Sequence, residues 1–244
     1  MADRIIKLTL EYDGTDYAGW QIQPDVVTIQ GALEEALATV LKEETRVHAA
    51  GRTDAGVHAA GQVVHFQTSV AMTPDEFRRA LNSLLPGDVR VVAAEEAPAD
   101  FHARFSARSR SYRYAVTFDD SVFTRRHAYC VAGPLDMEAM REAAALLVGE
   151  HDFAAFGNAS DDYDTSVRRV TEIRVEETLT GLEVYVTANA FLYKMVRNVV
   201  GTLLRVGRGE LAPADVGRLL AGKERAAAGT PAPPAGLTLL RVSY

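Results

Sequence analysis

The fold is decided first by residues 6–14, Ile-Lys-Leu-Thr-Leu-Glu-Tyr-Asp-Gly, in which apolar and polar side chains alternate up to an Asp-Gly turn. This period of two is typical of a strand with one buried face. The apolar side chains of residues 29–41 instead recur at helical spacing, which predicts a helix with one buried stripe. A strand followed by a helix, each with one apolar face, indicates helices layered on a sheet.

The remainder of the first half continues this alternation of elements. Strands are expected near Val47, over 62–68 and over 89–93, with a helix between the last two. Thr73 and Glu76 form a capping box that predicts the start of this helix, and Pro74 suits its first position. Its buried stripe is expected to comprise Phe77, Ala80, Leu81, Leu84 and Leu85.

The second half repeats the order loosely. Strands are expected over 112–118, 171–175, 182–186 and 239–243, and helices over 137–148, over 192–206 and from Pro213. The buried stripe expected for the 137–148 helix comprises Met137, Met140, Ala144, Leu147 and Val148. We therefore predict the α+β class, with two ferredoxin-like halves, 1–105 and 106–244, whose antiparallel sheets are joined across a central cleft.

Composition and motifs narrow the class of protein. With 244 residues, 48% of them hydrophobic and 24% charged, the chain has enough apolar surface for a packed core. The charged start does not match a signal peptide, and charges interrupt the longest apolar tract, so we expect a cytoplasmic protein without a membrane partner. The single cysteine, Cys130, excludes an intrachain disulfide. Nucleotide-binding and zinc motifs are missing, so neither a cofactor nor a metal is expected.

The charge distribution is uneven along the chain. The net charge is −7, but residues 101–118 carry four arginines and no acid. Because salt screens charges beyond about 10 Å, such a local basic stripe attracts phosphate although the whole chain is acidic. Arginine supplies 22 of the 26 cations, which suits phosphate binding but is equally well explained by coding bias.

Residues 51–61, Gly-Arg-Thr-Asp-Ala-Gly-Val-His-Ala-Ala-Gly, are the most unusual segment. Their three glycines allow an irregular backbone path, and Asp54 lies between Arg52 and His58. An Asp near Gly is more often a simple turn former. Against that interpretation, the segment is longer than a connection between two strands requires.

Two further segments carry candidate functional residues. In residues 101–114 aromatic side chains alternate with arginines, as on surfaces that bind single-stranded nucleic acid. Tyr114 is expected to be a core residue, whereas for Tyr112 core packing and base stacking remain equally open. In residues 189–198, Arg197 is a cation within an apolar helix, so it either faces solvent or pairs with a carboxylate such as Asp54.

Taken together, these segments resemble the tRNA pseudouridine synthase A family nearly from end to end. The resemblance rests on 11–15 (Glu-Tyr-Asp-Gly-Thr), 19–21 (Gly-Trp-Gln), 51–59, 61–66, 101–105, 112–114 (Tyr-Arg-Tyr), 195–198 (Met-Val-Arg-Asn) and 236–237 (Gly-Leu). Of these, Gly-Arg-Thr-Asp-Ala-Gly-Val-His is highly specific. The resemblance implies a cofactor-free isomerase that converts uridine to pseudouridine in the anticodon arm of tRNA, at tRNA positions 38, 39 and 40, and that acts as a homodimer.

The resemblance also implies roles for single residues. Asp54 matches the essential aspartate, Tyr112 the tyrosine that stacks on the target base, and Arg197 the basic partner of the aspartate. Arg52 matches an arginine associated with base flipping. Other residues expected to contact substrate or RNA are His58, Gln62, Phe101, His102, Arg104, Arg168 and Leu237. The chain departs from the family pattern at Ile22, where arginine is common, and in the acidic loop of Asp161, Asp162 and Asp164.

The implied reaction breaks the C1′–N1 bond of an extruded uridine, turns the base over and forms a C1′–C5 bond. Asp54 either attacks carbon covalently or removes the C2′ proton to give a glycal, and the sequence leaves both routes open. An apolar wall of Phe191, Met195 and Leu237 is expected to exclude water. The alternatives are a non-catalytic RNA-binding protein and a glycoside hydrolase, but a hydrolase needs a second carboxylate that the 51–61 segment lacks.

Overall fold

The computed structural model describes residues 4–157, 165–222 and 229–244. They cluster into two compact units: the chain up to Arg108 together with Thr238–Tyr244, and Ser109–Leu237. The C-terminal strand, expected in the second half, therefore belongs mainly to the first unit, because it pairs in parallel with a strand there. The acidic loop of Asp161, Asp162 and Asp164 lies outside the described residues.

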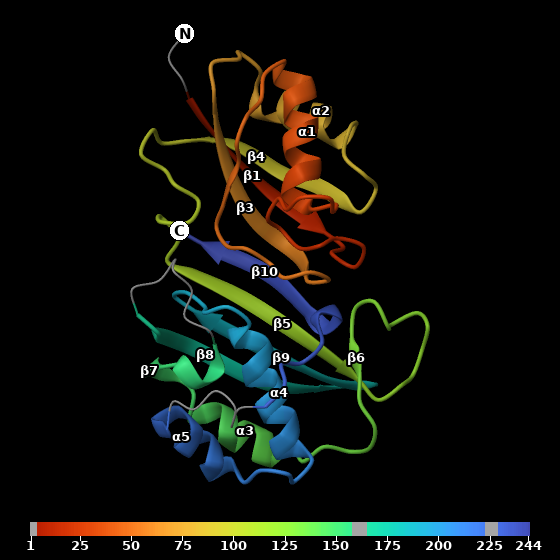
Figure 1. Ribbon diagram of the computed structural model, residues 1–244, viewed down its shortest axis with the longest axis vertical. Helices are drawn as coiled ribbons and strands as arrows, with labels where there is room; N and C mark the ends of the chain where they lie inside the picture. Colours follow the sequence, from red (N-terminus) through yellow and green to blue (C-terminus); the bar gives the residue numbers. More distant parts are fainter. Residues whose placement is uncertain (1–3, 158–164, 223–228) are drawn as a thin grey trace. The chain divides into compact units, whose positions relative to one another are not determined.

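The first unit is a sheet covered by two helices (Figure 1). Its elements are β1 (Arg4–Tyr12), α1 (Ile29–Leu41), β2 (His48–Ala49), β3 (His58–Thr68), α2 (Pro74–Asn82), β4 (Val89–Ala97) and β10 (Leu237–Ser243). The strand order is β4-β1-β3-β10, with β2 beside β3. β1 is antiparallel to both β3 and β4, whereas β10 runs parallel to β3.

The alternation in β1 separates the two faces of this sheet. Ile6, Leu8 and Leu10 are fully buried, which confirms the predicted apolar face. Phe66, the register partner of Ile6, packs edge-on against Phe77 of α2, with ring centroids 5.5 Å apart. This face therefore packs against the helices and forms the core of the unit.

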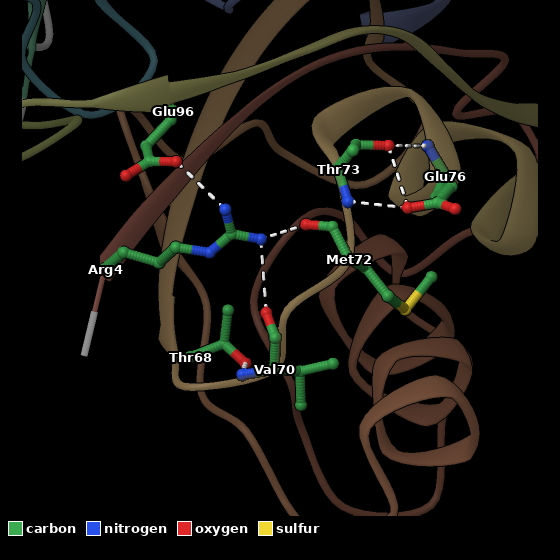
Figure 2. A network of polar contacts seen from close by, with 7 residues as sticks. All are labelled: Arg4, Thr68, Val70, Met72, Thr73, Glu76 and Glu96. Atoms are coloured by element: carbon green, nitrogen blue, oxygen red, sulfur yellow. Dashed lines mark hydrogen bonds and ion pairs between the residues drawn. The ribbon is translucent and has the colours of Figure 1, made fainter. Parts of the chain in front are cut away.

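Helix α2 begins as its capping box predicts. The Thr73 hydroxyl accepts a hydrogen bond from the Glu76 amide, and the Glu76 carboxylate accepts one from the Thr73 amide. The predicted stripe is wrong at Leu84, which is 47% exposed, because the helix already ends at Asn82. The segment before the helix is fixed by Arg4, whose guanidinium contacts Glu96 and donates to the carbonyls of Val70 and Met72 (Figure 2).

The second unit combines mostly antiparallel strands with helices (Figure 1). Its elements are β5 (Ser109–Thr117), β6 (Tyr129–Cys130), α3 (Met137–Ala145), β7 (Gly149–Asp152), a 3-10 turn (Ala154–Phe156), β8 (Val167–Thr178), β9 (Gly181–Ala188), α4 (Met195–Gly207), α5 (Pro213–Gly222) and a second 3-10 turn (Pro234–Gly236). The strand order is β5-β9-β8-β7, and the short β6 runs parallel to β5. The sequence pattern did not predict β6 or β7.

Two helices of this unit differ from the prediction at their ends. Helix α3 stops at Ala145 and Gly149 adopts a φ of 123°. The predicted buried stripe is therefore wrong at Val148, which lies beyond the helix and is 40% exposed. Helix α4 begins three residues later than predicted, because Lys194 takes a left-handed conformation with a φ of 60°. Most of α4 is buried, as its apolar sequence predicts.

The α+β class and the predominance of antiparallel strands are confirmed within each unit. The cleft expected between the halves stays a prediction. Within the residues that the structure describes, no helix is both long enough and apolar enough to cross a bilayer.

Candidate active site

The loop Gly51–Val57 connects β2 to β3 and carries Asp54. It is shorter than the predicted 51–61 segment, because β3 already begins at His58. The Asp54 carbonyl accepts a hydrogen bond from the Val57 amide at 3.1 Å, and Gly56 has a φ of 76°. This is the conformation that a type II turn requires at its third residue. Asp54 is thus the first residue of a turn, as the simpler interpretation predicts. It is half-buried.

The loop between β1 and α1 packs its backbone directly against this turn. A Cβ atom on Gly14 would lie 2.0 Å from the Val57 carbonyl oxygen, and one on Gly19 would lie 2.8 Å from that of Thr53. The Trp20 amide donates to the Thr53 carbonyl at 3.0 Å. Only glycine permits such an approach of two backbones. The position of the Asp54 peptide is therefore set by main-chain contacts.

Two buried side chains support the loop from the sheet. The hydroxyl groups of Tyr12 and Thr53 lie 2.8 Å apart, and Gln62 Nε2 donates to the Gly51 carbonyl at 2.8 Å. Burial raises the pKa of Tyr12 to about 12, so its hydroxyl group keeps its proton. Gln62 has no exposed surface. Gln62 therefore supports the loop, and its implied contact with RNA stays a prediction.

His58 and Arg52 differ in their access to solvent. His58 is 3% exposed, and its Nδ1 atom lies 3.1 Å from both the Gly14 amide and the Asp13 carboxylate. The backbone and hydroxyl groups of Thr15 already donate to that carboxylate, so we assign Nδ1 as the acceptor for the Gly14 amide. His58 hence supports the loop, and its implied contact with RNA stays a prediction. Arg52, by contrast, is exposed.

The turn Phe101–Ser106 displays an aromatic ring and a cation together. Phe105 is 77% exposed, and the Arg104 guanidinium lies 5.7 Å from the centre of its ring. Phe101 and His102 are half-buried. An exposed ring beside a guanidinium suits the stacking of an unpaired base and the binding of its phosphate.

In the second unit, Tyr112 lies on β5 and is 9% exposed. Its ring meets Phe191 edge to face, with centroids 5.1 Å apart. Tyr114, two residues later, is fully buried and donates to the Pro233 carbonyl at 2.8 Å, which confirms its core position. The half-buried Phe191 therefore fixes the orientation of the Tyr112 ring.

Arg197 lies in the first turn of α4 and is half-buried. Its Nε atom donates to the Ala232 carbonyl at 2.7 Å, and its own carbonyl accepts from the Ala232 amide at 2.9 Å. Burial raises the pKa of Tyr114, and the charge of Arg197 opposes this shift. The first turn of α4 contains no acidic residue. Cations at a helix N-terminus are unfavourable, so this arrangement favours a nearby anion.

Three other expected residues of this unit are buried. Arg168 is 4% exposed and donates to the carbonyls of Thr165 and Val167, and its implied contact with RNA stays a prediction. Leu237 is 6% exposed and Met195 is 1% exposed, as expected for parts of an apolar wall. Asp54 belongs to the first unit and Tyr112 and Arg197 to the second. That these three act on one nucleotide stays a prediction.

A cluster of three histidines in the first unit was missed by the sequence analysis. The ring of His65 lies 5.1 Å from that of His48 and 4.7 Å from that of His102. The spacing of these residues in the sequence gives no sign of the cluster. One signal could have found it. A strand near Val47 places His48 opposite a residue of the neighbouring strand, and in the structure this residue is His65.

Comparisons with known proteins identify the family of the chain. A family model described as tRNA pseudouridine synthase matches residues 9–106 and 143–244. The chain is 48% identical to tRNA pseudouridine synthase A of Geobacter sp. (strain M21) over 244 residues, which covers 99% of both chains. It is 46% identical to that of Brevibacillus brevis over 98% of this chain and 99% of the relative, and 44% identical to that of Caldicellulosiruptor bescii over 99% and 100%. On these matches, the chain belongs to the tRNA pseudouridine synthase family.

Proposed function

We propose that this chain, as a tRNA pseudouridine synthase, isomerises uridine to pseudouridine in the anticodon stem-loop, and that Asp54 is the acting anion. The observation that supports this is the loop Gly51–Val57. The loop is fixed by backbone contacts with Gly14 and Gly19, by the hydrogen bond of Gln62 to the Gly51 carbonyl and by that between the Tyr12 and Thr53 hydroxyl groups. The Asp54 residue nevertheless remains partly exposed. A surface turn needs no such support, whereas a group that must meet one atom of a substrate does.

The chemistry proceeds within one nucleotide and needs no cofactor. The target uridine leaves its helical stack, at a cost of a few kcal/mol, and its ribose meets the Asp54 carboxylate. Either the carboxylate forms a bond to C1′ as the base departs, or it removes the C2′ proton to give a glycal. In both routes the base turns over and C5 bonds to C1′. In the first route this bond displaces the carboxylate from C1′, and in the second the carboxyl group returns its proton to C2′. The C5 proton is then released, and N1 takes up a proton to give pseudouridine. Deuterium at C2′ slows only the second route.

We assign supporting roles to three residues. Tyr112 stacks on the extruded base, a contribution of about 1–3 kcal/mol. Arg197 supplies the positive charge that keeps the carboxylate ionised, in line with the acid-free first turn of α4. Arg52, which is exposed, takes the place of the extruded base. The buried Met195 and Leu237, with the half-buried Phe191, keep water from the sugar.

The decisive experiment gives Asp54→Asn protein an unmodified tRNA and measures the release of tritium from carbon 5 of labelled uridine. We expect activity to fall at least about a thousandfold, since the variant has no anion to act on the ribose. Asp25→Asn is the matched control: Asp25 is exposed with a φ of 60°, which asparagine tolerates, and its variant should keep full activity. Retention of activity in Asp54→Asn removes this residue from the mechanism. Tight tRNA binding without isomerisation by the unaltered protein would favour the non-catalytic alternative.

We further propose that the partners are tRNA and a second copy of this chain, in the cytoplasm. A single chain of 26.5 kDa offers few contacts to a tRNA much longer than itself, so a homodimer lets one copy hold the substrate while the other reacts. Light scattering of the protein with and without tRNA tests the assembly. Transcripts in which the uridines of the anticodon arm are replaced by cytidine test the location, and they should release no tritium.

A further inference from the structure

One residue of the turn Phe101–Ser106, Ala103, is held through both of its backbone polar groups. The amide of Ala103 donates to Nδ1 of His65 at 3.1 Å, and its carbonyl accepts from the Tyr244 hydroxyl at 2.9 Å. Ala103 itself has no exposed surface. All these residues belong to the first unit, although they lie far apart in the sequence. We call this pair of hydrogen bonds the Ala103 clamp.

We propose that His65 and Tyr244 are positioning residues that hold the turn Phe101–Ser106 in the shape that binds tRNA. The inference rests on the proposed function, in which this turn contacts RNA. Neither side chain touches the reacting atoms. Each acts through Ala103, and Ala103 fixes the direction in which Arg104 and Phe105 leave the turn.

The His65 side of the clamp depends on a neutral ring. His65 is 4% exposed, between His48 on β2 and His102 on the turn. Burial, followed by the charges of His102 and His48, lowers the pKa of His65 to about 4. At neutral pH the ring therefore has one acceptor nitrogen, which takes the Ala103 amide proton. The imidazolium form has two donors and no acceptor, so it could not accept this bond.

On the other side of the clamp, packing fixes the position of the Tyr244 ring and its hydroxyl group. Its ring lies 4.9 Å from that of Phe101, and the ammonium group of Lys7 lies 4.7 Å from its centre. The turn is also closed internally, because the Ser106 amide donates to the His102 carbonyl at 2.9 Å. A compact turn that is clamped at its buried residue presents its exposed residues as one rigid surface. Such a surface binds RNA without an ordering cost.

The test compares His65→Leu, which removes the acceptor, with His65→Asn, which keeps an acceptor close to the position of Nδ1. Tyr244→Phe removes only the hydroxyl group. The matched controls are His151→Asn and Tyr185→Phe, both in the second unit and outside the proposed site. Two quantities are measured: hydrogen exchange of the Ala103 amide in the free protein, and the dissociation constant for tRNA together with KM and kcat.

We expect His65→Leu to speed Ala103 exchange and to raise both the tRNA dissociation constant and KM about tenfold, the size of one lost buried hydrogen bond, with little change in kcat. His65→Asn should restore both values, and Tyr244→Phe should raise KM less. The clamp is refuted by unchanged exchange in His65→Leu, and the positioning role by equal KM values in His65→Leu and the unaltered protein. If the unaltered protein forms no pseudouridine, the proposed function fails, while exchange and tRNA affinity still decide the inference.

Discussion

Tyr12 is a residue whose single hydroxyl group bears on the geometry of the proposed active site. It reaches from β1 to the Thr53 hydroxyl, which is next to Asp54 and only 7% exposed. Because the pKa of Tyr12 is raised to about 12, this contact persists at every pH at which the enzyme would work. The residue therefore links the sheet to the loop without taking part in proton transfer.

Tyr12→Phe should lower kcat about tenfold, because the Thr53 hydroxyl then loses a buried partner at a cost of about 1–3 kcal/mol and the loop shifts. KM for tRNA should change little, since Tyr12 is 4% exposed and offers RNA almost no surface. Steady-state kinetics on a tRNA transcript provide the measurement, with Tyr185→Phe as the control. A rise in KM at constant kcat would contradict the role given to Tyr12.

His65 gives the fold a dependence on pH. Its pKa is 6.5 ordinarily and about 4 in the folded protein, so between these values the unfolded chain binds more protons. The free energy of unfolding must then be highest above pH 6.5 and fall as the pH decreases towards 4. His102 and His48 face the ring, and their charges act in the same direction as burial on the pKa of His65.

Urea unfolding at several pH values should therefore show a steeper loss of stability in the unaltered protein than in His65→Asn. Carboxylates titrate in both proteins, so their contribution cancels in the comparison. Parallel curves for the two proteins between pH 6.5 and 4 would contradict the lowered pKa of His65.

At the scale of elements, the loop before α1 and the loop Gly51–Val57 behave as one structure. A methyl group on Gly14 would lie 2.0 Å from the Val57 carbonyl oxygen, whereas one on Gly51 would meet nothing within 4 Å. Gly14→Ala should thus separate the two loops, lower the free energy of unfolding by about 1–3 kcal/mol and abolish most activity. Gly51→Ala should change stability by less than about 1 kcal/mol. Thermal unfolding and the tritium assay distinguish the two variants, and equal behaviour of both would show that the close packing is unimportant.

At the scale of the whole molecule, charge determines how tRNA is attracted. The net charge is −7, so the proposed binding of tRNA requires local cations, a role that we assign to Arg52 and Arg104. We expect tRNA affinity to fall steeply with salt, and the slope of log K against log salt to decrease by about 1–2 when both arginines become glutamine. Arg218→Gln, on the exposed side of α5, is the control. An unchanged slope in the double variant would place the phosphate contacts elsewhere.

The last strand shows how distant parts of the chain complete one unit. β10 runs parallel to β3, and a Cβ atom on Gly61 would lie 2.3 Å from the Leu240 carbonyl oxygen. The sequence predicts a strand over 239–243. It does not predict the neighbouring strand, because the apolar pattern of a strand describes its faces and not its edges.

The sequence by itself determined the local features of the chain and those that it shares with the family. The bounds of α1 agree with the pattern of residues 29–41, and the capping box of α2 forms as its spacing requires, because both depend on contacts within a few residues. The segment around Asp54 indicates the family for a different reason, because its residues match a motif of that family. These features can be predicted from the sequence without knowledge of the tertiary structure.

Only the tertiary structure decided which side chains are accessible and which distant groups meet. Gln62, His58 and Arg168 match positions implied to contact RNA, yet all three are buried and bind backbone groups. The Ala103 clamp joins residues 65, 103 and 244, and no pattern along the chain relates them. The reason is physical: burial and hydrogen bonding between distant segments depend on how faces and edges pack, whereas periodicity records only which face of each element is apolar.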